Sequence, residues 1–402
     1  MAKYEVITAR AGGNSYVLPS SQFLHIGGSF TALESTEANV KVKLYDSYIA
    51  ADFIINITAN TASAIATIRI RKNGANGNGV ISVGTGVTGI LEDTSNSDSF
   101  VNGDDINYAF TAPGASSGSV TFTSIGITLA HNTTDTTVLV TLADAETAAA
   151  GATTYHAIGG RGLGNPTEAN TQYIMRDTTT LKQLRCYISA NTSTNSTTLT
   201  LRKNGADTSV TITIGAGVTG ALEDTTNTAS IAVGDKVNYK FVGPSSGNTH
   251  AFELIQITSL SSKRQYISSH GGAGGISFSD NSTAYYVCLE ALLERITSEA
   301  NTKYKLRIST AASALQVNVV TNSRVTGTVV TFRKNGAASE LTFTIAAGAT
   351  GILEDASNTV ALAPGDLVNF EVKTSTGGGV LIFQQMGCTL QNSSGFYVII
   401  VD

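Results

Sequence analysis

The sequence predicts an all-β protein of three tandem antiparallel jelly-roll or β-sandwich domains. Three observations predict this fold class. The pentapeptide Arg-Lys-Asn-Gly-Ala occurs three times, at an interval of 131 residues. The segments around it alternate between apolar and polar residues, as half-buried strands do. Charged residues make up only 14% of the chain, whereas Gly, Thr, Ser and Asn are abundant, which is typical of proteins rich in strands and turns.

The 131-residue interval extends well beyond the pentapeptide. Three further motifs and two single asparagines recur in the same register, without insertion or deletion between them. They are Glu-Ala-Asn from Glu37, Glu168 and Glu299; Thr-Gly-x-Leu-Glu-Asp from Thr88, Thr219 and Thr350; Gly-Asp from Gly103, Gly234 and Gly365; and Asn60 and Asn107 with their equivalents. A period of this length is that of a whole domain with its own core. We therefore divide the chain into repeat 1 (residues 1–134), repeat 2 (135–265) and repeat 3 (266–402).

The pentapeptide lies between two predicted strands. Residues 198–201 precede it in repeat 2, residues 210–214 follow it, and both segments have the two-residue period of a strand. Asn-Gly between two strands favours a type I′ turn, which needs a positive φ at both central residues. We therefore expect a hairpin at each Asn-Gly pair, and about eight short strands in each repeat. Residues 287–296 fit either a short helix or an irregular strand.

The apolar strand that opens each repeat occurs once more at the end of the chain. Residues 4–7 open repeat 1, residues 138–140 hold the corresponding place in repeat 2, and residues 266–267 open repeat 3. The same interval from Tyr266 leads to the terminal stretch, residues 396–401. We expect each boundary strand to pair with the preceding or a neighbouring domain, and the extra copy to close a ring.

The Gly-Asp motif with its following strand (Val233 to Tyr239) resembles the late strands of the complement-head and tumour-necrosis-factor jelly rolls. Domains of that kind work as trimers, so the resemblance implies a pseudo-trimer within this one chain. The hairpin together with Thr-Gly-x-Leu-Glu-Asp resembles repeats in structural proteins of tailed bacteriophages and related virions. These motifs cover about half of each repeat.

Composition and motifs argue against several classes of function. The net charge is −5 with no basic cluster, unlike a nucleic-acid-binding surface. No apolar segment approaches the ~18 residues of a membrane span, and the N-terminus lacks the apolar stretch of a signal peptide. Cys186, Cys288 and Cys388 lack the spacing of a disulfide framework or a metal site. No hydrolase, phosphate-binding or dinucleotide motif is present. We expect no enzyme activity and no cofactor.

Two symmetric sets of charged residues are the candidate interaction sites. The acidic set can collect Ca²⁺, or can consist of turn and edge residues that keep a sheet edge from aggregating. The basic set can contact an acidic partner, can reach the acidic set across the axis, or can be a solvated hairpin end. The acidic set comprises Glu92, Asp93, Glu223, Asp224, Glu354 and Asp355, and the basic set comprises Arg71, Lys72, Arg202, Lys203, Arg333 and Lys334.

The function that these features favour is a structural virion protein. We expect a capsid decoration, cement or other exterior component that docks through its pseudo-threefold shape onto a capsid or other virion protein. It would be made in the host cytoplasm without a signal peptide and would be a monomeric pseudo-trimer before assembly, with no nucleic acid or membrane partner. The alternatives are a receptor- or glycan-binding module of a viral fibre or adhesin, and an extracellular filament subunit.

Overall fold

The computed structural model describes residues 3–11, 15–17, 21–30, 33–112, 116–131, 136–148, 151–243, 249–260, 264–269, 274–289, 295–306, 309–391 and 400–401. These residues form strands and three short 3-10 helices, with no α-helix among them. In this part of the chain, no helix has the length and hydropathy needed to cross a membrane. Val287 ends a strand, and residues 290–294 of the ambiguous segment lie outside the described residues.

The strands of repeat 1 form two sheets. One sheet has the order β10-β6-β12-β1-β4, with β2 on β12 and β9 on β6, and the other has the order β3-β11-β7-β8, with β5 on β11. The elements are β1 (Lys3–Ala11), β2 (Ser15–Val17), β3 (Gln22–Leu24), β4 (Gly28–Phe30), η1 (Glu37–Val40), β5 (Val42–Lys43), β6 (Tyr48–Asn60), β7 (Ala66–Lys72), β8 (Ala75–Val83), β9 (Gly89–Asp93), β10 (Asp98–Phe100), β11 (Asp105–Thr111) and β12 (Ser119–His131).

Repeat 2 has the same plan. Its sheets have the orders β15-β13-β22-β17-β20 and β14-β21-β18-β19, with β16 on β21. The elements are β13 (Thr136–Ala148), β14 (Thr153–His156), β15 (Gly160–Arg161), η2 (Glu168–Asn170), β16 (Tyr173–Ile174), β17 (Thr179–Asn191), β18 (Thr197–Lys203), β19 (Ala206–Ile214), β20 (Gly220–Ile231), β21 (Lys236–Val242) and β22 (His250–Leu260).

Repeat 3 follows the plan again, with the last strand of the chain added to one sheet. The sheets have the orders β23-β32-β27-β30, with β24 on β32, and β29-β28-β31-β26-β33, with β25 on β31. The elements are β23 (Arg264–Ser269), β24 (Ile276–Phe278), β25 (Ala284–Val287), η3 (Glu299–Thr302), β26 (Tyr304–Leu306), β27 (Thr310–Asn322), β28 (Thr328–Lys334), β29 (Ala337–Ile345), β30 (Gly351–Leu362), β31 (Leu367–Thr374), β32 (Leu381–Gln391) and β33 (Ile400–Val401).

The hairpin turns have the expected conformation. Asn73, Asn204 and Asn335 have φ values of 51°, 51° and 53°, and the glycines that follow them have φ values of 81°, 80° and 79°. Both central residues therefore lie in the left-handed region, as a type I′ turn requires. Asn tolerates this region because its short polar side chain bonds locally, and Gly has no Cβ to clash.

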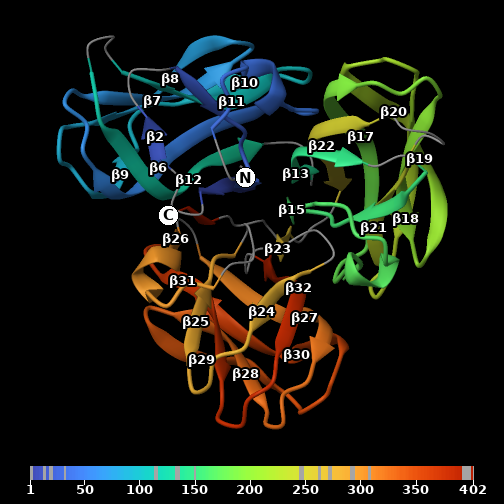
Figure 1. Cartoon of the computed structure of the whole chain (residues 1–402). Coiled ribbons are helices and arrows are strands. Elements are labelled where there is room, and N and C mark those ends of the chain that lie inside the picture. Colours follow the sequence, from blue (N-terminus) through green and yellow to red (C-terminus); the bar gives the residue numbers. More distant parts are fainter. Residues whose placement is uncertain are drawn as a thin grey trace.

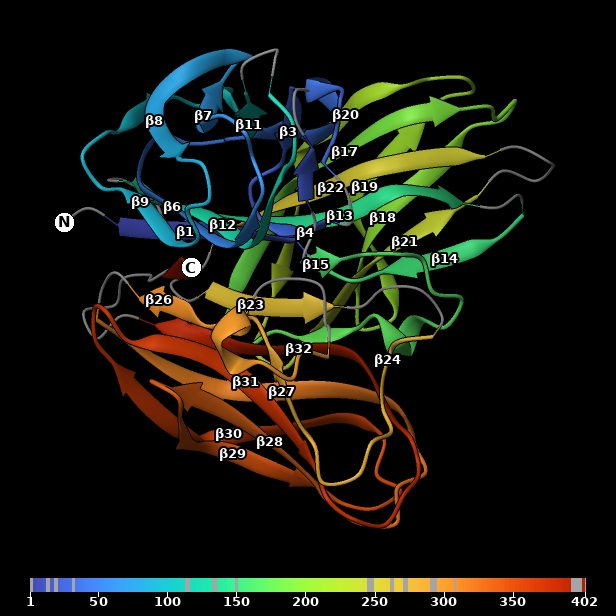
Figure 2. The same cartoon turned by 60° about the vertical axis from the view of Figure 1, so that its left-hand side comes forward.

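The six sheets form a ring in which the three repeats surround a common centre (Figure 1). Each repeat buries its own apolar cluster, because the inward-facing residues of its two sheets meet. Near the centre, β4 of repeat 1 contacts β13 and β15 of repeat 2, and β15 contacts β23 of repeat 3. The N- and C-termini lie on the same side of the molecule (Figure 2).

The expectation that boundary strands pair outside their own repeat is wrong for the three opening strands. The strands β1, β13 and β23 each pair antiparallel with the last strand of the same repeat, which are β12, β22 and β32. The last strand of the same repeat offers the nearest free row of backbone N–H and C=O groups. The opening strand therefore makes its backbone hydrogen bonds within its own repeat. The connection between repeats is made by side chains instead.

The strand β13 shows how those side chains connect two repeats. Val138 and Val140 belong to the apolar cluster of repeat 1, whereas Leu139 between them belongs to the cluster of repeat 2. All three side chains are at most 2% exposed. Because neighbouring side chains on a strand point to opposite faces, this one strand contributes to both cores.

The terminal strand β33 pairs with β26 of repeat 3 and also contacts β1 and β12 of repeat 1. It therefore lies at the junction between the last repeat and the first. Residues 392–399 lie outside the described residues.

We predict that deleting residues 396–402 lowers the melting temperature, because β26 loses a paired strand and the junction between repeats 3 and 1 loses contacts. Thermal unfolding followed by circular dichroism measures this change. A control deletion of Asp402 alone leaves β33 intact. An unchanged melting temperature in the longer deletion would show that β33 does not stabilise the junction.

Candidate functional site at the junctions between repeats

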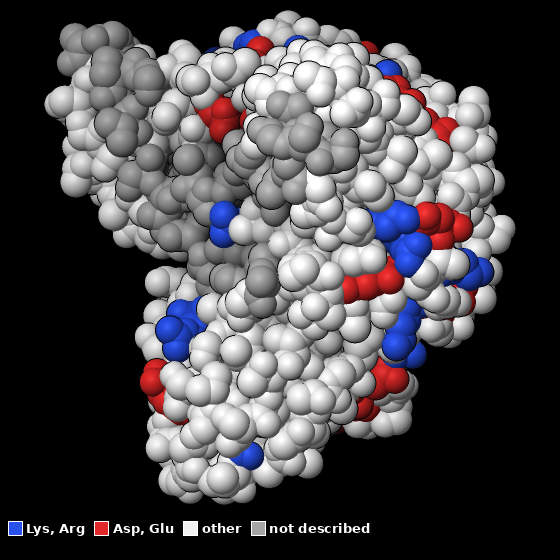
Figure 3. Space-filling model, turned by 45° about the vertical axis from the view of Figure 1, so that its right-hand side comes forward, with Lys and Arg blue, Asp and Glu red and all other residues white. Residues whose placement is uncertain are grey.

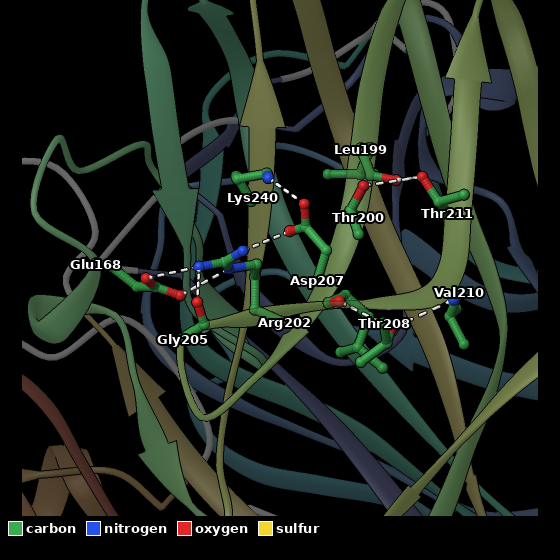
Figure 4. Close-up of polar contacts among 11 residues, drawn as sticks. Glu168, Leu199, Thr200, Arg202, Gly205, Asp207, Thr208, Val210, Thr211 and Lys240 are labelled. Atoms are coloured by element: carbon green, nitrogen blue, oxygen red, sulfur yellow. Dashed lines mark hydrogen bonds and ion pairs between the residues drawn. The ribbon is translucent and has the colours of Figure 1, made fainter.

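The arginine of each hairpin binds the glutamate of the Glu-Ala-Asn motif in the same repeat. In repeat 2, Arg202 Nε donates to Glu168 Oε1 at 2.9 Å, and Nη2 donates to Glu168 Oε2 at 3.0 Å. The same guanidinium binds the carbonyl oxygen of Gly205 and the carboxylate of Asp207, which also contacts Lys240 (Figure 4). Arg71 with Glu37 and Arg333 with Glu299 repeat the two-point contact. This fork geometry is the one that suits Arg and excludes Lys.

The lysine and asparagine of each hairpin bind the aspartate of the Gly-Asp motif. Lys203 Nζ lies 2.8 Å from Asp235 Oδ2 and 2.9 Å from the carbonyl oxygen of Ser230. Asn204 Nδ2 donates to Asp235 Oδ1 at 2.7 Å, and Asn204 Oδ1 accepts from the backbone N–H of Lys236 at 2.8 Å. The equivalent lysine and asparagine contacts occur in repeats 1 and 3.

These contacts bring three recurring motifs into one cluster. The hydrogen bonds from Lys203, the backbone of Ala232 and Asn204 lower the pKa of Asp235 to about 2. The hydrogen bond to Glu168 raises the pKa of Arg202. Each hairpin cation of the basic set thus has an anionic partner within its own repeat. The Asn-Gly pair of the hairpin is thus explained by the turn, and the preceding Arg-Lys pair is explained by its ion pairs with Glu and Asp of the same repeat.

The aspartate of the Glu-Asp pair stabilises a turn within its repeat. Asp224 accepts backbone N–H groups from Thr211 at 2.9 Å, Thr226 at 3.2 Å and Asn227 at 3.1 Å, and also binds the Asn227 side-chain amide. Burial acts to raise its pKa, but these hydrogen bonds outweigh burial and lower it. Asp93 and Asp355 have matching donors and lowered pKa values. The groups that bond these carboxylates are N–H donors and, in each repeat, one hydroxyl donor, which is Ser95, Thr226 or Ser357.

The glutamate of the Glu-Asp pair faces the preceding repeat around the ring. Glu223 of repeat 2 lies 3.0 Å from Lys43 Nζ of repeat 1 and 3.4 Å from Arg185 Nε. Glu354 of repeat 3 binds Arg176 of repeat 2. Glu92 of repeat 1 lies 3.2 Å from Lys305 Nζ of repeat 3, which completes a cycle of three contacts. The cations that meet the acidic set across the junctions are thus Lys43, Arg176 and Lys305, not those of the hairpins.

Buried polar side chains add hydrogen bonds at the first two junctions. Gln256 of repeat 2 accepts the backbone N–H of Lys43 at 3.1 Å and donates to the carbonyl oxygen of the same residue, and Arg185 donates to Lys41 O at 2.8 Å. In repeat 3, Gln316 donates to Ile174 O at 3.1 Å and Asn318 donates to Ala169 O at 2.8 Å. The fixed backbone of one repeat is therefore bound by side chains of the next.

Sequence reasoning did not identify the three junction cations. Lys43 and Lys305 keep the repeat interval, but the equivalent residue in repeat 2 is Ile174, and its cation lies two residues later at Arg176. The shared register of Lys43 and Lys305 was a signal that could have identified two of the three.

Other chemistry is sparse in the described part of the chain. No group of three or more His, Cys, Asp and Glu side chains among those residues is arranged to hold a metal ion. The three cysteines are unbridged and buried. Burial raises the pKa of Cys186 to about 12 and also raises that of Cys388, so neither thiol ionises readily near neutral pH.

No protein-family model and no curated protein matches the chain. Two solved structures are similar to it over most of its length. One, described as "The Triple Jelly Roll Fold and Turret Assembly in an Archaeal Virus", shows 11% identity and a TM-score of 0.19, with 96% of this chain and 91% of that chain covered. The other, described as "Life in the extremes: atomic structure of Sulfolobus Turreted Icosahedral Virus", shows 12% identity and a TM-score of 0.17, with 96% and 92% covered. TM-scores this low do not assign the chain to the fold of either structure.

We predict that Asp224→Asn destabilises the protein more than Glu223→Gln. Asp224 loses an oxygen that accepts backbone N–H groups, at a cost of about 1–3 kcal/mol. Glu223 is a partly exposed ion-pair partner, so its loss costs up to ~1 kcal/mol. Urea unfolding of both variants measures the difference, and the reverse order would contradict the assignment of turn and junction roles.

We predict that the protein loses stability in acid, between pH about 4 and pH about 2. The lowered pKa of Asp235 means that its ionised form stabilises the fold above the unfolded-state pKa of about 3.9, and that this contribution disappears as the pH falls through about 2. The pKa values of Asp104 and Asp366 are also lowered. The melting temperature should therefore fall across this pH range, and Asp235→Asn should reduce the dependence of the melting temperature on pH.

Proposed function

We propose that this protein is a non-enzymatic structural component of a virion, acting as a capsid decoration or cement protein or another exterior component. The three repeats would be jelly-roll domains of about 131 residues that together form a single-chain pseudo-trimer. The single observation that supports this proposal best is the closed cycle of Glu contacts, in which each repeat binds the next through an equivalent residue.

The ring has the physical properties that a docking component needs. Its junctions combine ion pairs, buried amide hydrogen bonds and apolar side chains shared between cores. The covalent links between repeats remove the association entropy that three separate chains would lose on forming a trimer. A preassembled body with three equivalent units fits a local threefold position, where three weak contacts add through effective concentration.

The test is to mix the purified chain with virus particles that lack it. We expect a monomer of 41.6 kDa in sedimentation equilibrium that binds particles to a fixed, saturable stoichiometry. Matched controls are disassembled coat protein and an unrelated particle. Open-ended polymers of the purified chain would indicate a filament subunit instead, and saturable binding to glycans without binding to particles would indicate a receptor-binding module.

A further inference from the structure

In each repeat, three loops meet at the end of the sheets opposite the hairpin, which we term the loop end. In repeat 1, the backbone N–H of Thr61 donates to Ser119 O at 2.8 Å, and Asn60 Nδ2 donates to Gly84 O at 2.7 Å and Val87 O at 3.0 Å. Asn191 and Asn322 make the equivalent pairs of bonds. The described residues of the loop ends are 61–65, 84–88, 112 and 116–118 in repeat 1; 192–196, 215–219, 243 and 249 in repeat 2; and 323–327, 346–350 and 375–380 in repeat 3.

The loop ends carry almost no charge. Arg324 is the one charged residue in these loops, and it is 2% exposed, with its guanidinium bonded to the carbonyl oxygens of Gly379 and Ser375. Lys373 and Asp280 lie beside the loop end of repeat 3. On the face drawn in Figure 3, charged side chains gather at the right and form smaller groups at the top and at the left, with broad uncharged areas between them.

Large aliphatic side chains are exposed at all three loop ends. Repeat 1 exposes Ile65 (55%) and Val87 (39%), and repeat 2 exposes Val218 (38%) in a loop and Val242 (37%) at the end of β21. Repeat 3 exposes Val325 (68%) in a loop and Val329 (38%) near the start of β28. Single exposed aliphatic residues are ordinary on protein surfaces, but a pair at the same end of every repeat is a patterned surface. In repeat 3, Lys373 is the charged neighbour, because it lies opposite Val329 in the sheet.

The second loop of each repeat is also held in place by hydrogen bonds within that repeat. The asparagine side chain ties the second loop of each repeat to the end of a sheet strand, and Val87 and Val218 lie on that tied loop. A surface that is already ordered loses little conformational entropy on binding. The hairpin end is less suited to docking, because its lysines and arginines are already paired within the chain and binding there would break those pairs.

We propose that the loop ends are three docking feet for uncharged protein surfaces on neighbouring copies of a coat subunit, one foot for each copy. This inference rests on the proposed function. Charged groups of a partner would lose their hydration against these loops and would find no opposite charge there. We therefore infer that the partner surface presents aliphatic and hydroxyl groups. The three loop ends lie at the periphery of the ring, so they reach three separate positions around its centre (Figure 1).

The test compares charges introduced at opposite ends of the same repeats. Val87→Asp with Val218→Asp alters two feet, and the matched control, Val101→Asp with Val233→Asp, alters exposed valines (58% and 59%) beside the Gly-Asp turns. We expect the first pair to weaken binding to particles at least a hundredfold, because two of three linked contacts are lost, and the control pair to change it less than threefold. All four valines are exposed, so both variants should keep the wild-type melting temperature.

Salt provides a second measurement. Binding through uncharged feet should stay constant or tighten as NaCl rises from roughly 0.05 M to 0.5 M, whereas contacts between charges weaken. If the two variants bind alike, or wild-type binding falls steeply with salt, the loop ends are not the docking feet, although the proposed function stands. If wild-type protein does not bind particles at all, the proposed function fails and the feet fail with it.

Discussion

The two-point contact between each hairpin arginine and the glutamate of the Glu-Ala-Asn motif is the interaction on which the ring depends. It fixes a 3-10 helix against the hairpin of the same repeat, and that helix leads into the segment bound by the next repeat. The helices η1 and η2 contact strands of the following repeat, whose side chains bind Lys41 O, Lys43 O and Ala169 O. The packing within one repeat thereby creates the surface that holds its neighbour.

Much of the architecture was predictable from the sequence, because the relevant interactions are either local or repeated. Asn-Gly determines its turn from two residues, and an interval shared by several motifs indicates a repeated unit whatever its fold. The partner of Arg202 is 34 residues away, so no local pattern identifies it. Both Glu168 and Arg202 recur at the 131-residue interval, but this interval does not show that the two residues contact each other. The junction contacts are harder still to predict, because they join residues up to 214 positions apart and differ in type from one junction to the next.

Each of the three junctions contains the glutamate of a Glu-Asp pair, but the side chains around that glutamate differ between junctions. Repeat 2 places Arg185 where repeat 3 places Gln316 and repeat 1 places Ile54, all three of them buried. A cation, an amide and an aliphatic chain thus occupy equivalent places at the three junctions. Fusion into one chain permits such divergence, because each repeat needs to match a single designated neighbour and need not be complementary to itself.

The alternation along β13 has a consequence for how the molecule loses its structure. Val138 and Val140 are part of the core of repeat 1, while Leu139 and the backbone ladder belong to repeat 2. If β13 leaves the sheet of repeat 2, Val138 and Val140 no longer cover the core of repeat 1, and that core becomes exposed to water. We therefore expect fraying at β13 to be transmitted between repeats 1 and 2, so that these two repeats unfold together under heat or protease.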